Sequence, residues 1–104
     1  MLFLSVGSFA SPVLAGTTSA DFLKWEPKSQ ASFLHTSISM AATIATQVRP
    51  KVARCIDHWY FKSDEAKEAR NAEIMAVMSK YTAYHPSSVL FAVIEKACGK
   101  FGSN

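Results

Sequence analysis

Apolar side chains recur at helical spacing along two stretches in the middle of the chain. The first series follows i, i+4, i+7, i+11 and i+14 at Leu34, Ile38, Ala41, Ala45 and Val48. The second follows i, i+3, i+4, i+7 and i+8 at Val52, Cys55, Ile56, Trp59 and Tyr60. Each series lies on one face of an α-helix, as in an amphipathic helix that packs on a core. We expect Ser29 to cap the first helix and Pro50 to begin the second.

Two further helices are predicted from their end signals and their apolar faces. Ser63 or Asp64 is a suitable N-cap for a third helix, and His85-Pro86 begins a fourth that ends before Gly99. The expected inner face of the third helix is Ala66, Ile74, Val77, Met78 and Tyr81. That of the fourth is Val89, Leu90, Val93, Ile94, Ala97 and Cys98. Because no segment alternates like a strand, the chain is predicted to be all-α, a small bundle of four main helices.

The stretch from Ser29 to Val48 carries no charge, so a membrane-spanning helix must be considered. About half of its residues are polar, whereas a spanning helix needs about 20 predominantly apolar residues. We therefore expect no stable membrane span in the mature chain.

Residues 1–15, MLFLSVGSFASPVLA, have the apolar run and the small residue before Gly16 that are typical of a signal peptide. Cleavage after Ala15 is favoured over cleavage after Ala10, although no Lys or Arg precedes the apolar run. The alternative is a buried N-terminal element. Residues 16–104 are predicted to form a single helical domain, and the localisation to be periplasmic or secreted.

The chain contains two cysteines, Cys55 and Cys98. Export would place them in an oxidising compartment, where pairing is expected. Two buried free thiols are the alternative. In the chain-entropy model a bond between them stabilises the fold by about 4 kcal/mol, which is large for so small a domain.

The sequence contains few candidates for chemistry. The 11 basic and 8 acidic residues give a net charge of +3, too small and too dispersed to predict nucleic-acid binding. Cys55 and His58 have the spacing of a Cys-His pair, but a thiol consumed in a disulfide is neither nucleophile nor metal ligand. No nucleotide, zinc or serine-hydrolase motif is present, so we expect no enzyme activity, metal or cofactor.

Aromatic residues give the best candidate for a partner surface. Three in succession, Trp59, Tyr60 and Phe61, cannot all face one core, so at least one is expected at the surface or beneath a partner. Phe91 falls outside the apolar stripe of the last helix and raises the same question. Packing within the chain is the alternative for all four.

The half-chain from Cys55 resembles the small periplasmic immunity proteins of the Tai/Rap type, which neutralise peptidoglycan amidases delivered by type VI secretion. The shared features are Cys55-Ile56 opening a helix, Lys80-Tyr81 ending one, the His85-Pro86 start and the closing Cys98. HdeA-type acid chaperones are similar in size, helix content and a disulfide that closes a comparable loop.

These resemblances imply an exported binding protein, an inhibitor that occludes a cell-wall-degrading effector. The alternatives are an HdeA-like acid-stress chaperone, which binds unfolded clients and in which charge repulsion opens a dimer at low pH, and a structural envelope protein. The expected partner is a protein, either an effector or an unfolded client, and a homodimer is possible.

Overall fold

The computed structural model describes residues 17–102, and the predicted signal peptide lies outside them. The elements are α2 (Ser19–Phe22), α3 (Pro27–Val48), α4 (Pro50–Ile56), the π-helical turn η1 (Asp57–Phe61), α5 (Asp64–Met78) and α6 (Pro86–Cys98). Residues 17–102 contain no strand, and four of the α-helices are seven residues or longer. The prediction of an all-α fold with four main helices is confirmed.

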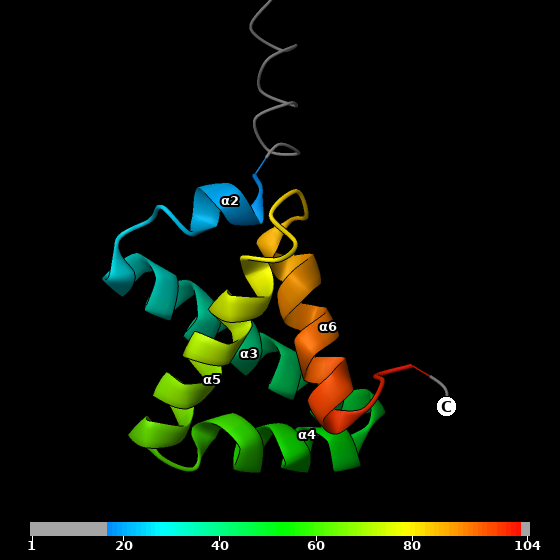
Figure 1. The fold of residues 1–104 in the computed structure, drawn as a ribbon. Coiled ribbons are helices and arrows are strands. Elements are labelled where there is room, and N and C mark those ends of the chain that lie inside the picture. The colour runs from blue at the N-terminus through cyan, green and yellow to red at the C-terminus, as the bar shows by residue number, and fades with distance from the viewer. Residues whose placement is uncertain (1–16, 103–104) are drawn as a thin grey trace, which may run out of the picture.

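α4 and η1 follow each other without a break and together form the base of the fold, around which the other helices are arranged (Figure 1). α5 rises from the η1 end of this base, and α6 returns to the α4 end (Figure 1). α3 packs against α4, and α2 lies near the connection between α5 and α6. None of the described helices combines the length and the apolar character that crossing a membrane requires.

The core is continuous and draws on every helix. Its buried residues are Phe22, Leu34, Ile38, Ala45, Val52, Ala53, Ile56, Tyr60, Ile74, Met78, Val89, Leu90, Val93 and Ile94. Most belong to the four predicted inner faces. Burial of such side chains contributes about 1.5–3 kcal/mol each before the entropy of ordering the chain is subtracted.

Most of the predicted helix boundaries are confirmed. Pro50 occupies the first turn of α4, and the Ser63 hydroxyl caps α5 by accepting a hydrogen bond from Ala66 N at 3.0 Å. At α6, Nδ1 of His85 accepts from Ser87 N at 3.0 Å. Gly99 ends α6 with φ at +103°, a conformation that glycine adopts without a Cβ penalty.

Two boundaries differ from the prediction. α3 begins at Pro27, with Glu26 as its N-cap, so Ser29 is not the cap. The fixed φ of proline suits the first helical turn, which lets the helix start earlier than the serine signal indicated. α5 ends at Met78, so Tyr81 lies beyond the helix and is exposed, not on its inner face. Val48 and Ala97, each in the last turn of its helix, are exposed as well.

Cys55 and Cys98 form a disulfide with their Cα atoms 5.5 Å apart and 43 positions apart in the sequence. The bond joins the end of α4 to the end of α6. It encloses η1, α5 and α6 within one covalent loop.

Candidate functional site

Nucleophilic or metal chemistry at Cys55 has no thiol to support it. Both cysteines are bonded to each other, and the neighbouring His58 is exposed. Within residues 17–102 no three His, Cys, Asp or Glu side chains are grouped as a metal site.

Tyr60, one of the predicted partner-surface residues, is fully buried. Its hydroxyl donates a hydrogen bond to Asn71 Oδ1 at 2.8 Å, which ties η1 to α5. Burial raises the pKa of the Tyr60 phenol above its ordinary value. Tyr60 continues the i, i+4, i+8 series of Val52 and Ile56 on the core side of the base, so it has no side-chain surface to offer a partner.

The other two residues of the aromatic run flank the core and are covered by basic side chains of α5. The guanidinium of Arg70 lies over the Trp59 ring at 5.6 Å, and Arg70 Nε donates to Trp59 O at 3.1 Å. Lys67 Nζ lies 5.8 Å from the Phe61 ring centre. Trp59 and Phe61 are half-buried and pack against the core. The side chains of the three successive aromatics leave the π-helical turn in different directions, so only that of Tyr60 is fully buried.

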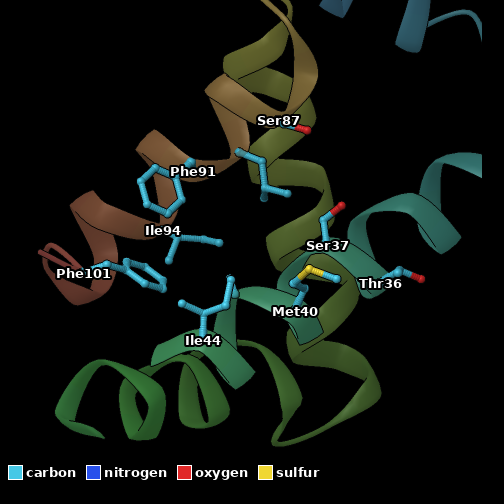
Figure 2. A pocket seen from close by; sticks show the side chains of 10 residues that line it. Thr36, Ser37, Met40, Ile44, Ser87, Phe91, Ile94 and Phe101 are labelled. Atoms are coloured by element: carbon cyan, nitrogen blue, oxygen red, sulfur yellow. The ribbon is translucent and has the colours of Figure 1, made fainter. Parts of the chain in front are cut away.

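Phe91, the fourth predicted residue, is 43% exposed and lines a groove between α3 and α6 (Figure 2). The volume of this α3–α6 groove is about 310 Å³. Its lining is Thr36, Ser37, Met40, Ala41, Ile44, Ser87, Leu90, Phe91, Ile94 and Phe101. The Phe91 and Phe101 rings contact each other with centres 5.0 Å apart.

The α3–α6 groove is apolar and uncharged. Met40 is 61% exposed and Ile44 is 49% exposed, while Leu90 and Ile94 below them are buried. Figure 2 shows Phe91, Phe101, Ile44 and Met40 around the opening, with the hydroxyls of Thr36, Ser37 and Ser87 toward one end. None of the lining residues carries a charge. Such a site suits an apolar side chain or helix face better than a charged ligand.

The segment that carries Phe101 is held in place at the edge of the groove. Arg49 Nη1 donates a hydrogen bond to Gly102 O at 3.1 Å, across 53 positions of sequence. This contact fixes the chain after α6 against the junction of α3 and α4, so that Phe101 forms one wall.

A second groove lies between α5 and α6 and has a different character. It has a volume of about 850 Å³ and is lined by Glu73, Val77, Lys80, Tyr81, Tyr84, Ser88, Val89, Ala92, Val93, Lys96 and Ala97. Tyr81 and Tyr84 are 51% and 59% exposed and meet edge to face, with ring centres 5.9 Å apart. This α5–α6 groove contains charged and aromatic groups together.

Among the groove residues only Phe91 was predicted as a site. Met40, Ile44 and Val48 recur at i, i+4 and i+8, a second apolar stripe beside the inner stripe of α3. That stripe is visible in the sequence, but which stripe faces the core depends on how α3 meets α4 and α6. Tyr81 was predicted on the inner face of the third helix, and Tyr84 lies in the connection between α5 and α6, where no helical periodicity marks it.

Comparison of the chain with family models, curated proteins and solved structures finds no match, so the resemblance to the Tai/Rap type rests on the residues quoted for it above.

Proposed function

We propose that the chain is an exported binding protein that docks a partner protein in the α3–α6 groove. The observation that carries this proposal is the exposure of Met40, Ile44 and Phe91 around an uncharged opening. Exposed apolar side chains grouped in this way mark interaction sites more often than scattered ones do. The occupant is an apolar anchor of the partner, such as the face of an amphipathic helix, because a charged group placed there would lose water without gaining a counter-charge.

The form of binding that we propose is inhibition of a cell-wall-degrading effector by covering its active-site cleft. Steric inhibition requires a rigid surface and no catalytic group. The disulfide and the Arg49 contact to Gly102 both restrict the walls of the groove, which reduces the entropy lost on binding. The disulfide is compatible with an oxidising compartment, where such an effector acts.

The test uses the protein and the products of the genes that neighbour its own. Each neighbour is directed to the periplasm of a host cell, alone and together with the chain, and lysis is followed. We expect one neighbour to be lytic and the chain to prevent lysis and to co-purify with it. Ile44→Glu, which places a charge in the groove, should abolish protection.

The matched control is Thr43→Glu, on the same helix but outside the groove and exposed to solvent. It should protect as the parent does. Failure of the parent chain to bind any of the neighbouring gene products would refute the proposal. Equal effects of Ile44→Glu and Thr43→Glu on protection would refute it as well. If the protein suppresses the aggregation of unrelated clients, and does so only at acid pH, the acid chaperone is indicated instead. If it neither protects from an effector nor suppresses aggregation, a structural envelope role is favoured.

A further inference from the structure

We propose that the α5–α6 groove is a second binding site, and that its ligand is an acidic amphipathic segment of a protein. This groove lies on a different face of α6 from the α3–α6 groove, because Ser88, Ala92 and Lys96 line one and Ser87, Phe91 and Ile94 line the other. The centres of these two sets lie about 130° apart around the helix. The proposal therefore does not depend on the function assigned to the first groove.

One wall is formed by the edge-to-face pair Tyr81 and Tyr84, which the chain holds in place. Tyr84 O accepts hydrogen bonds from Ser19 N at 2.7 Å and from Ser19 Oγ at 2.9 Å. Ala20 N donates to Thr82 O at 3.1 Å. α2 thus fixes the connection between α5 and α6, and two exposed tyrosines stand on a backbone that is already ordered. Tyrosines presented in this way bind partners at low entropic cost.

The floor of the groove is apolar. Val89 and Val93 of α6 are almost fully buried, and half-buried Val77 lies beside them on α5. An occupant must therefore present an apolar face to α5 and α6.

The charges of the groove lining that have no ion-pair partner among residues 17–102 are positive. Lys80 and Lys96 are both exposed, and neither forms an ion pair with any of the residues 17–102. The one acidic lining residue, Glu73, pairs with Arg70, whose Nη1 lies 3.2 Å from Glu73 Oε1. A carboxylate on the occupant would supply the missing partner for each lysine.

The position of the lysines sets the spacing of those carboxylates. Lys80 precedes Tyr81 in the connection between α5 and α6, whereas Lys96 is in the last turn of α6. Ser88 lines the groove at the start of α6, next to this connection, and the helical rise places it about 12 Å along the axis from Lys96. Two helical turns span a similar distance, so the occupant that fits carries acidic residues about two turns apart with apolar residues between them.

The probe is a synthetic helical peptide of about 14 residues with two glutamates two turns apart and leucines between them on the same face. A second peptide has glutamine at both glutamate positions. Binding to the disulfide-bonded protein is measured by titration calorimetry, and the site by amide chemical shifts. We expect the acidic peptide to bind at least about tenfold more tightly than the neutral one and to shift signals of α5 and α6.

Charge reversal tests the role of the lysines. The variant with Lys80→Glu and Lys96→Glu should bind the acidic peptide at least about tenfold more weakly than the parent protein does. It should instead bind a peptide with lysines in place of the glutamates. The matched control is Lys51→Glu combined with Lys62→Glu, which changes net charge equally at two exposed lysines outside the groove. It should bind as the parent does.

Each other outcome overturns the proposal. Equal loss in both double variants would mean that only net charge matters. Shifts confined to α3 and Phe101 would place the peptide in the first groove. No preference for the acidic peptide at concentrations up to about 1 mM would mean that the lysines do not select the ligand. Circular dichroism of both variants verifies that the fold is retained.

Discussion

Tyr60 heads the fully buried side chains by volume, and its hydroxyl is the one polar atom that it brings into the core. The hydrogen bond to Asn71 Oδ1 satisfies that atom and joins the π-helical turn to α5. A buried hydroxyl without a partner costs about 1–3 kcal/mol, so the phenol and the amide are best understood as a pair.

Replacing the phenol tests this pairing. Tyr60→Phe should lower the free energy of unfolding by about 0.5–1.5 kcal/mol, because Asn71 loses its partner. Chemical denaturation measures the change. In the Tyr60→Phe background, Asn71→Ala should cost less than it does in the parent chain. Additive losses would show that the two side chains are not coupled.

The same substitution has a consequence at alkaline pH. The pKa of Tyr60 is raised by burial in the folded state, so above a pH of about 10 the unfolded chain releases its phenolic proton first. Stability should therefore be complete below that pH and fall as the pH rises further. Tyr60→Phe should remove this part of the alkaline loss.

At single residues, the sequence predicted chemistry that is local. The cap of α5 by Ser63 and that of α6 by His85 follow from neighbours in sequence, and the disulfide between Cys55 and Cys98 was expected from the predicted compartment. The roles of Trp59 and Phe61 could not be predicted in this way, because the cations that cover them come from α5.

Most helices begin and end at the residues that local capping signals predict. The exceptions occur where two such signals compete or where no signal is present. Pro27 and Ser29 are both reasonable start signals for α3, and the fold uses the earlier one. The π-helical turn at Asp57–Phe61 has no sequence signature and was not predicted. A regular helix there would point Trp59, Tyr60 and Phe61 in other directions relative to α5.

The end of α6 allows a direct test of backbone conformation. Gly99→Ala should destabilise the fold by about 1–3 kcal/mol, since a φ of +103° is strained for any residue with a Cβ. The space itself is adequate, because the added Cβ would lie 3.9 Å from Val52 Cγ2.

The control for this substitution is Gly102→Ala. Nothing lies within 4 Å of the added Cβ at that position, and its φ is not positive. Thermal denaturation should place it with the parent chain. Equal melting temperatures for the two variants would mean that the helix end tolerates the strain.

For the whole molecule, the sequence predicted the helices and their covalent link but not the two grooves. Each groove is formed by two helices whose relative position depends on long-range packing. Met40 and Phe91 are 51 positions apart and line one opening, which no local pattern indicates. The apolar stripes alone could not show which of them the fold leaves uncovered.

The disulfide is expected to make a large contribution to stability. Cys55→Ala combined with Cys98→Ala should lower the free energy of unfolding by up to about 4 kcal/mol, a large part of the total for a domain of this size. Circular dichroism in denaturant measures it. Reductant should destabilise the parent protein and leave the double variant unchanged; a parent protein indifferent to reductant would contradict the expectation.

The position of that covalent link also determines how the molecule responds to proteolysis. The connection at 79–85 is mostly exposed and lies within the loop that Cys55 and Cys98 close. A single cut there would leave two fragments still joined through sulfur, each carrying one helix of the α5–α6 hairpin. The nicked protein would migrate as one species on a non-reducing gel and as two after reduction, so an intact band without reductant would not show an intact backbone.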